Sequence, residues 1–582
     1  MKITLNSKQY DIDSMVEKQV SPFTTKIGTP TVEWGNFAPC SVDEYRDLRG
    51  GLGLESTEGV TNRFYWADGV ETTKEGYLTL GPLVTTAGTF GGYALKIIDF
   101  QNATYGLGNS LCKKWNTSTS AWDASHDGTP LTTPTDAIVV TDATDEYLIV
   151  CNGANVQMTV DGAAWTTLST ENLKYMCFFD NRLIGVDAAY NKIWYSPRDD
   201  IDGTLASFNI SGDYSVVTDL FSGKLLTTGE PCIYMLTDTG LYSVDFYTQT
   251  IYKMEVRYPY TTKAYVGMYW NGYVYVATGM GIARLTADTV EQWGPDADGG
   301  LPNGYQGYVT DMIGIAHWVI IAVAEGTNKS LLKRHESTGG WHQITTSANI
   351  KKVVCHSPSS MYSPGRLWFG DSTSIKYVQF PDTTHDITKV TGYEYALSGT
   401  LYLPQFSRVS SMPKVAVELT ALADDLTASY KATPSYIVNN PISLSDGDWT
   451  ALSAWTTTPQ PSSSFGSSLG VSFYDICFKI VFTRAGTTTS TPVVKSIGFK
   501  YVGLPPVVTA WQFVVKGMGD RAKEIITNLE TARDTTTLIN FSPDGDTNIS
   551  VKYVKIMSMP SRRELEGHRA DQTFTVTVAE VS

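Results

Sequence analysis

The feature that most constrains this chain of 582 residues is a unit of about 40 residues that recurs through its middle. Each unit reads as a short apolar strand, a turn rich in Gly, Asn or Asp, a second strand, another polar turn and an aromatic residue. Clear hairpins are YLIVCNGANVQMTV from Tyr147, CIYMLTDTGLYSVDF from Cys232 and RLWFGDSTSIKYVQF from Arg366. The aromatics after the second turn lie 39 to 48 residues apart: Trp122, Trp165, Phe208, Tyr252, Trp293, Trp341 and Phe380. This period is typical of propeller blades, so we predict a β-propeller of about seven blades over residues 91–381.

After the propeller the pattern changes twice. Longer alternating strands such as KVAVELTALA and DICFKIVFTRAG, with Ser/Thr/Pro-rich spacers between some of them, predict a β-sandwich over residues 392–504. Residues 505–582 carry the clearest helix signal, GDRAKEIITNLETARD, with Asp520 as a candidate N-cap and strands on either side. Its apolar residues at helical spacing are Ala522, Ile525, Ile526 and Leu529. We therefore predict an all-β chain: a propeller, then a sandwich, then a small C-terminal α+β module.

The first 90 residues are less regular and are treated as a separate N-terminal segment. SVDEYRDLRGG predicts a short helix that begins after Ser41 and ends at Gly50, and NRFYWADG and GYLTLGPLV predict strands. A propeller must hold its first and last blades together. We expect the segment up to Thr86 to supply the outer strand of the last blade.

Charge and composition narrow the classes of function. The formal net charge is -15, and nucleic-acid binding depends on clustered Lys and Arg, so sequence-specific nucleic-acid binding is not expected. No apolar run is long enough to span a membrane, and the N-terminus lacks the apolar core of a signal peptide. We therefore expect synthesis in a host cytoplasm and no membrane span.

The seven cysteines are odd in number and scattered, with no CxxC pair. This pattern predicts reduced, buried thiols rather than a zinc site or a disulfide framework. They are Cys40, Cys112, Cys151, Cys177, Cys232, Cys355 and Cys477.

The stretch KSLLKRHESTGGWHQI gathers His335, Glu336 and His342 in one short segment and resembles a catalytic constellation. Its Ser337–Gly340 segment reads as a tight turn, and Trp341 occupies the recurring aromatic position. Sister hairpins carry the turn and the tryptophan without His or Glu. We therefore interpret both histidines as strand residues on a blade.

Two other segments with candidate catalytic residues are also interpreted as turns or loops. The segment from Thr159 to Trp165, TVDGAAW, is one residue short of a sialidase Asp box and occurs once, where several copies would be expected. Asp199, Asp200 and Asp202 form the densest acidic group, but a glycosidase needs two carboxylates that converge in a cleft.

Two short acidic fragments resemble half of a calcium loop. They are DGDTN from Asp544, with Asp546, and DADGG from Asp296, with Asp298. Oxygen ligands at alternating positions suit calcium, but neither fragment has the downstream Glu of an EF-hand. We assign no catalytic, cofactor-binding or metal-binding residue, and we expect no enzyme activity and no cofactor.

Three stretches, NKIWYSPRDDIDG, SVVTDLFSGKLLTTGEPCIYMLTDTGLYSV and SIGFKYVGLPPVVTAWQFVV, together with the order of the domains, resemble propeller-bearing tail proteins of tailed bacteriophages. The resemblance covers roughly residues 180–580. It implies a virion structural protein of the tail tip, baseplate or nozzle that forms a symmetric homo-oligomeric ring with other tail proteins. Host attachment and DNA passage are the roles such a ring would serve.

The second hypothesis is a glycan-binding or glycan-degrading phage spike. Its site would lie at the mouth of the propeller channel, and its partner would be a host surface glycan or receptor. Loss of polymer length from host capsule or lipopolysaccharide separates the two hypotheses.

Overall fold

The computed structural model describes the chain outside a set of short gaps. These are residues 21–39, 109, 124–130, 143–144, 255–264, 280, 296–299, 325–326, 385, 467–469, 504–507, 518–519, 536–537, 546–551, 560–571 and 581–582. The chain forms two compact units. One comprises Met1–Val42, Val409–Val415 and Tyr501–Ser582, and the other comprises Asp43–Arg408 and Ala416–Lys500.

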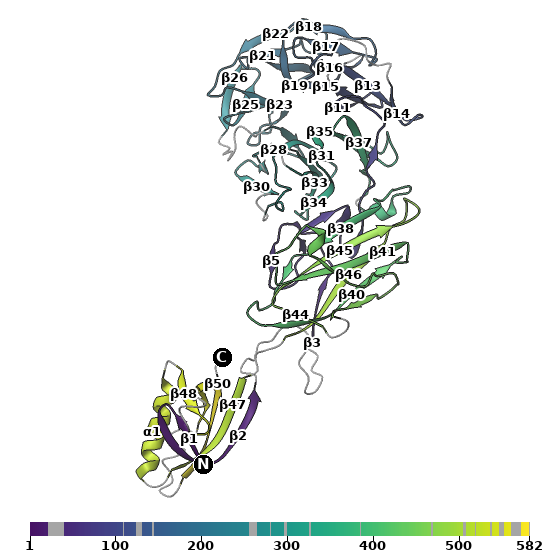
Figure 1. Cartoon of the computed structure of the whole chain (residues 1–582). Helices are drawn as coiled ribbons and strands as arrows, with labels where there is room; N and C mark the ends of the chain where they lie inside the picture. The colour runs from purple at the N-terminus through teal and green to yellow at the C-terminus, as the bar shows by residue number, and fades with distance from the viewer. Residues whose placement is uncertain are drawn as a thin grey trace. The chain divides into compact units, whose positions relative to one another are not determined.

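Within the described residues, the middle of the chain forms seven four-stranded antiparallel sheets arranged as the blades of a propeller (Figure 1). The innermost strands of successive blades pack side by side, and β11 packs beside β35, so the ring is closed. The strands of blades 1 to 3 are β11 (Ala94–Phe100), β12 (Ala103–Gly108), β13 (Leu111–Asn116), β14 (Ala121–Asp123), β15 (Asp136–Thr141), β16 (Glu146–Cys151), β17 (Val156–Thr159), β18 (Thr166–Ser169), β19 (Leu173–Phe179), β20 (Arg182–Asp187), β21 (Lys192–Tyr195) and β22 (Ala206–Asn209). The strands of blades 4 to 6 are β23 (Val217–Lys224), β24 (Pro231–Thr237), β25 (Leu241–Asp245), β26 (Thr250–Met254), β27 (Gly267–Trp270), β28 (Tyr273–Ala277), β29 (Ile282–Leu285), β30 (Val290–Gly294), β31 (Val309–Ile315), β32 (Trp318–Val323), β33 (Lys329–His335) and β34 (Trp341–Ser347). Blade 7 contains β35 (Ile350–Ser357), β36 (Arg366–Asp371), β37 (Ser374–Gln379) and β10 (Thr85–Thr86).

The second strand of each blade is buried between neighbouring blades. All six residues of β32 are buried, and five of the six residues of β16 are buried. A strand covered on both faces reads as a continuous apolar run rather than as an alternation. This burial explains why the apolar run that contains Trp318–Val323 forms strands and no helix.

The recurring aromatics mark the outermost strand of most blades. Trp122, Phe208, Trp293 and Trp341 lie on β14, β22, β30 and β34 and are buried. Three positions differ: Trp165 directly precedes β18 and is half-buried, Tyr252 on β26 is 57% exposed, and Phe380 is buried but follows the third strand of its blade. Phe380 differs because the outer strand of blade 7 comes from another part of the chain.

That outer strand is β10, which pairs antiparallel with β37, with Thr85 opposite Tyr377 and Thr86 opposite Lys376. This is the closure that the sequence predicted. A buried hydrogen-bond network also joins blades 1 and 7. The carboxylate of Asp99 accepts from the hydroxyls of Thr104 and Ser357 at 2.8 Å each, and the indole N–H of Trp368 donates to Ser357 at 2.9 Å.

The β-sandwich combines residues from both sides of the propeller in sequence. Phe499 of one sheet packs against Phe478 of the other, with ring centroids 4.8 Å apart. The first sheet holds β43 (Ser462–Ser464), β40 (Lys414–Asp424), β46 (Val493–Gly503), β9 (Tyr77–Leu80), β8 (Val70–Lys74), β3 (Cys40–Tyr45) and β44 (Val471–Phe473). The second holds β42 (Thr450–Ala451), β41 (Tyr430–Val438), β45 (Ile476–Arg484), β38 (Ser398–Tyr402), β7 (Trp66–Asp68), β39 (Gln405–Phe406) and β5 (Ser56–Thr57). The remaining short elements are β4 (Gly51–Leu52), paired with β6 (Arg63–Phe64), and the 3-10 helices η4 (Ile387–Lys389) and η5 (Asp446–Asp448).

The helix predicted in SVDEYRDLRGG is wrong, because Cys40–Tyr45 is strand β3 and pairs with β46. A helix of about two turns is marginal by itself, whereas pairing with a long strand satisfies the backbone directly. The strands predicted in NRFYWADG and GYLTLGPLV are confirmed as β6, β7 and β9.

The last domain is a closed six-stranded barrel with one helix against it. The order around the barrel is β1 (Lys2–Leu5), β2 (Lys8–Val20), β47 (Val508–Gly517), β50 (Gln572–Glu580), β49 (Lys552–Ser558) and β48 (Ile539–Ser542). The predicted helix is confirmed as α1 (Asp520–Asp534), and it buries Ile526, Leu529 and Ala532 against the barrel core. The first residues of the chain are thus part of the C-terminal domain.

The three domains are nested in sequence. The first 90 residues are shared among them: residues 1–20 belong to the barrel, the strands within residues 40–80 to the sandwich, and Thr85–Thr86 to the propeller. The propeller is therefore inserted in the sandwich sequence, and the sandwich in the barrel sequence.

Candidate functional site

Three aspartates on the innermost strands each bind the blade that follows. The carboxylate of Asp136 accepts the backbone N–H of Met176 at 2.9 Å, and the carboxylates of Asp219 and Asp311 accept those of Gly267 and Val354 at 2.8 Å each. Because each acceptor lies one blade before its donor, these bonds join blade 2 to 3, blade 4 to 5 and blade 6 to 7. We call these three side chains the inter-blade aspartates.

Lys96 on β11 is a cation of this region, with its ammonium 2.8 Å from the carboxylate of Asp136. Its side chain keeps 40% of its surface accessible to water. Burial by itself lowers the pKa of Lys96, but the attraction of Asp136, followed by Asp311 and Asp219, raises it overall. Lys96 is therefore positively charged at neutral pH.

Two of the inter-blade aspartates, Asp219 and Asp311, have raised pKa values. Burial raises the pKa of Asp219 to about 7, opposed by the N–H of Gly267 and reinforced by the charge of Asp136. Burial likewise raises the pKa of Asp311 to about 6, with Lys96 opposing it. Carboxyl groups with such values are found in acid–base catalysts and in structural networks. Here both carboxylates are engaged by backbone N–H groups, which favours a structural role.

These aspartates share a short sequence feature that belongs to none of the catalytic or metal-binding motifs considered above. A Thr-Asp pair opens the inner strand of every second blade: Thr135–Asp136, Thr218–Asp219 and Thr310–Asp311. Because the Thr-Asp pair recurs only in alternate blades, it is not part of the 40-residue pattern that all blades share. The inner strands of the intervening blades carry other residues near their starts. These are Lys96 on β11, Tyr175 on β19 and Gly267 on β27.

The segment with His335, Glu336 and His342 is a hairpin of blade 6, as predicted. Its three polar side chains have partners in three different parts of the structure. The Nδ1 of His335 accepts the backbone N–H of Ser337 at 3.2 Å within the turn, and the imidazole centroid lies 4.7 Å from that of Trp318. Glu336 accepts from the amide of Asn271 in blade 5 at 2.8 Å. His342 is buried and its Nδ1 lies 2.8 Å from the hydroxyl of Thr72 in the sandwich.

His342 belongs to a buried joint between blade 6 and the sandwich. Lys333 forms an ion pair with Glu71 at 2.7 Å, with side-chain exposures of 9% and 7%. Burial by itself raises the pKa of Glu71, but Lys333 and the hydroxyl of Thr73 lower it overall. Burial lowers the pKa of His342 to about 4, so the imidazole is neutral at pH 7. The cavity at this joint is about 20 Å³, room for little more than a water molecule.

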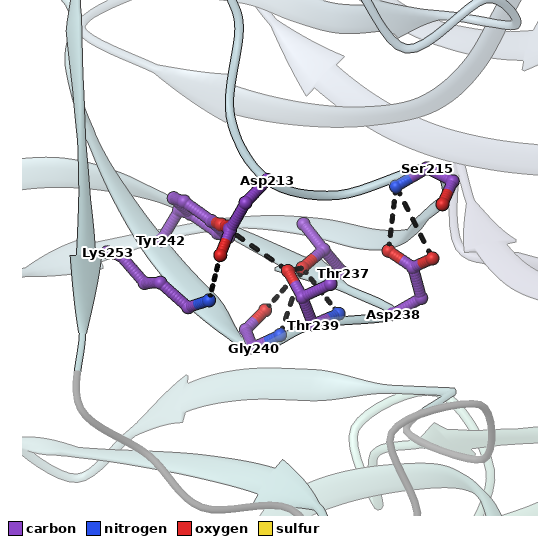
Figure 2. Close-up of polar contacts among 8 residues, drawn as sticks. All are labelled: Asp213, Ser215, Thr237, Asp238, Thr239, Gly240, Tyr242 and Lys253. Carbon is purple, nitrogen blue, oxygen red and sulfur yellow. Dashed lines mark hydrogen bonds and ion pairs between the residues drawn. The ribbon is translucent and has the colours of Figure 1, made fainter.

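A second polar network fixes the outer part of blade 4 (Figure 2). The carboxylate of Asp213 accepts from the hydroxyl of Tyr242 and lies 2.6 Å from the ammonium of Lys253, which lowers the pKa of Asp213. Asp238 accepts the backbone N–H of Ser215 at 3.0 Å. These bonds hold the loop before β23 against β25 and β26, so the network stabilises the blade.

The other predicted turn residues behave as turns. Asp161 accepts the N–H groups of Ala163 and Ala164 at 2.8 Å each, which lowers its pKa, and Gly162 has a φ of 75°. Asp199, Asp200 and Asp202 are exposed in the loop after β21.

The calcium-like fragments are only partly described. The carboxylate of Asp544 accepts from the hydroxyl of Ser542 at 2.7 Å. Asp546, Asp296 and Asp298 lie outside the described residues. Where the chain is described, no group of three or more His, Cys, Asp or Glu side chains is placed to hold a metal ion.

Six cysteines are free thiols, five of them buried and Cys355 half-buried, while the side chain of Cys40 is outside the description. Burial raises the pKa of the Cys177 and Cys477 thiols, as expected for unreactive core thiols. Among the described residues, no helix combines the length and apolar character that a membrane crossing requires.

Larger cavities also lie among the described residues. One of about 550 Å³ lies beside the β31–β32 turn and is lined by Ile313, Gly314, Ile315, Ala316, His356 and Asp382. Its polar groups are held by the protein: the Nε2 of His356 lies 3.2 Å from the carbonyl of Phe380, and Asp382 accepts from Ser359. Another cavity, of about 490 Å³, lies on the sandwich.

No protein-family model matches this sequence, and no curated protein matches it. Among solved structures, the extracellular domain of a one component system from B. thetaiotaomicron is 9% identical, with a TM-score of 0.39, and the match covers 71% of this chain and 61% of that one. An ancestral GH74 enzyme is 10% identical, with a TM-score of 0.37 and coverage of 66% and 55%. A chain of the Mitotic Checkpoint Complex is 14% identical, with a TM-score of 0.39 and coverage of 56% and 96%. This chain spans less than two thirds of the length of the first two, and similarity at this level carries no argument about function. The all-β propeller fold rests on the sheet topology itself.

Proposed function

We propose that this chain is a structural component of a bacteriophage tail, located at the tip, baseplate or nozzle. Several copies would form a symmetric ring around the tail axis, together with other tail proteins. The proposal starts from the resemblance of the domain order and of three sequence stretches to such proteins. Under this proposal the protein is made in the host cytoplasm and becomes part of the virion.

The observation that carries the proposal is the use of buried and half-buried polar side chains as joints between parts of the chain. Asp136, Asp219 and Asp311 connect blades, and Lys333 with Glu71 connects a blade to the sandwich. A buried, satisfied polar network holds one arrangement because any shift leaves a charge or an N–H unpaired. A propeller and a sandwich joined through such contacts suit a mechanical role.

A role without catalysis is part of the proposal. Asp219 and Asp311 are the described carboxyl groups with pKa values nearest those of an acid–base pair, and each already accepts two backbone N–H groups. The net charge of -15 supports a position beside passing DNA, because it gives no attraction for phosphates.

Particle imaging tests the proposal directly. The purified chain would be examined by mass photometry and electron microscopy, and virions from a phage with a tagged copy would be labelled with antibody against the tag. We expect three-fold or six-fold rings and label at one position of the tail. A stable monomer that is absent from particles would contradict the proposal.

A glycan-degrading spike is the alternative from another class. Incubation of the purified protein with host capsule or lipopolysaccharide, followed by size-exclusion chromatography of the polymer, distinguishes it. We expect no change in polymer length relative to heat-inactivated protein. Shortening that is lost in an Asp219→Asn variant would favour the enzyme instead.

A further inference from the structure

The sandwich carries a cavity of about 490 Å³ that none of the roles above uses. Three loops meet there: the β40–β41 turn, the β45–β46 turn and the connector before β38. The lining includes Asp425, Thr427 and Tyr430 at the first of these loops, Ser490 on the second and Tyr395 on the third. The volume falls within the range of about 300 to 1,000 Å³ that is typical of small-molecule sites.

The lining is rich in hydroxyl groups. Seven of the nine lining side chains carry one, and Asp425 is the single carboxylate among them. A hydroxyl both donates and accepts hydrogen bonds, so it matches a ligand that itself presents many hydroxyls. The hydroxyl oxygen of Thr427 already accepts the N–H groups of Ser429 and Tyr430, which leaves its hydrogen to donate.

The loops that form the cavity are tied to one another. The N–H of Ala485 donates to the carbonyl of Ser429 at 2.7 Å, and the N–H of Tyr395 donates to the carbonyl of Thr488 at 2.8 Å. The hydroxyl of Tyr430 lies 3.2 Å from that of Thr487. Binding to preformed loops costs less ordering entropy, so this arrangement favours ligand binding.

We infer that this cavity binds a neutral saccharide. Tyr430 is half-exposed at the cavity and presents an aromatic ring on which the apolar face of a sugar ring can stack. Asp425 is exposed, with a φ of 56° that turns the chain at this point, and its carboxylate can accept from two neighbouring sugar hydroxyls. An anionic sugar would be repelled by Asp425, since the lining contains no Lys or Arg.

The inference rests on the sandwich cavity alone and stands apart from the tail assignment. It also differs from the spike hypothesis, which locates a glycan at the mouth of the propeller channel. A virion protein without sugar binding and a sugar-binding protein outside virions are therefore distinguishable results.

The test uses the full-length chain and a panel of neutral disaccharides and trisaccharides built from glucose, galactose, mannose and N-acetylglucosamine. Binding would be detected by saturation-transfer difference NMR and quantified by calorimetry, with sialyllactose as the anionic comparison. We expect at least one neutral sugar to bind and sialyllactose to bind more weakly than lactose.

Variants locate the site. Tyr430→Ala and Asp425→Ala should each weaken binding by about tenfold or more, and Tyr430→Phe should retain most of it because the ring remains. Tyr474→Ala is the matched control, since Tyr474 is a 49% exposed sandwich tyrosine that does not line the cavity. Thermal unfolding of each variant verifies that it is folded.

Two results would overturn the inference. The first is a folded wild-type protein that binds no member of the neutral panel. The second is binding that Tyr430→Ala and Asp425→Ala leave unchanged, or that is as strong for sialyllactose as for lactose.

Discussion

At the scale of single residues, the buried charges of this protein act as joints between structural elements. Glu71 and Lys333 come from the sandwich and from blade 6 and neutralise each other where both are almost fully buried. Removing one partner leaves a buried charge unpaired, which costs far more than the net contribution of the pair. An exposed ion pair such as Lys495 with Asp424 differs, because both groups remain hydrated when they separate.

Lys333→Ala should lower the free energy of unfolding of the propeller–sandwich unit by about 3 to 5 kcal/mol. Lys495→Ala removes the exposed partner of Asp424, and because water hydrates both groups it should cost far less than Lys333→Ala. Urea unfolding followed by tryptophan fluorescence measures both. Equal losses for the two variants would show that burial of the Lys333–Glu71 pair has no special weight.

His342 gives the joint a pH dependence with a definite sign. Burial lowers the pKa of His342 to about 4 from an ordinary value of 6.5, so the unfolded chain takes up the proton first as pH falls. The contribution of His342 to stability is therefore complete above pH 6.5 and is lost as pH falls toward 4.

His342→Gln should remove this part of the pH dependence. The difference in unfolding free energy between wild type and variant, measured from pH 7 to pH 4, should shrink as pH falls. A difference that is constant across this range would mean that His342 titrates alike in both states.

At the scale of elements, inner-strand carboxylates hold successive blades in register. The carboxylate of Asp311 accepts the N–H of Met312 on its own strand and that of Val354 on the next inner strand. Asp219 does the same for Leu220 and Gly267. A sheet edge that lies inside the molecule must have its N–H groups satisfied, and side chains supply this where no backbone acceptor is available.

Asp311→Ala should therefore loosen the contact between blades 6 and 7. The cost is expected to be about 1 to 3 kcal/mol, the penalty of buried donors left without a partner. Hydrogen exchange of the Val354 and Met312 amides should become faster. Asp238→Ala, which removes a half-buried carboxylate of blade 4 that accepts from Ser215 and Val216, is the control and should leave those amides unchanged.

At the scale of the whole molecule, each domain is built from segments that lie far apart in the sequence. The propeller is completed by Thr85–Thr86, the sandwich by strands before residue 81, and the barrel by the first 20 residues. The first and last blades of the ring are held together by β10 as well as by the network of Asp99, Ser357 and Trp368.

A fragment of residues 82–381 contains all seven sheets and should fold by itself as a monomeric propeller. A fragment of residues 88–381 lacks β10 and leaves the edge of β37 unpaired, so it should unfold at a lower temperature and aggregate. Size-exclusion chromatography and thermal unfolding compare the two. Identical behaviour would show that the outer strand is dispensable for closure.

Local features of the sequence determined the fold class and most of the strands. The 40-residue repeat, the turn residues and the aromatic spacing predict the propeller, and the helix Asp520–Asp534 follows from the spacing of its apolar side chains. The Thr-Asp pairs of alternate blades are a local signal of the same kind. These signals are local because turns and periodicity depend on neighbouring residues.

Only the tertiary structure decided which distant strands pair. Leu5 lies opposite Phe541, Leu401 opposite Ala67, and Thr85 opposite Tyr377. Strand propensity reflects how a side chain fits its cross-strand neighbours, and those neighbours are absent from a local pattern. For the same reason Cys40–Tyr45 became a strand, and the hydroxyl-lined cavity emerged only where loops far apart in sequence meet.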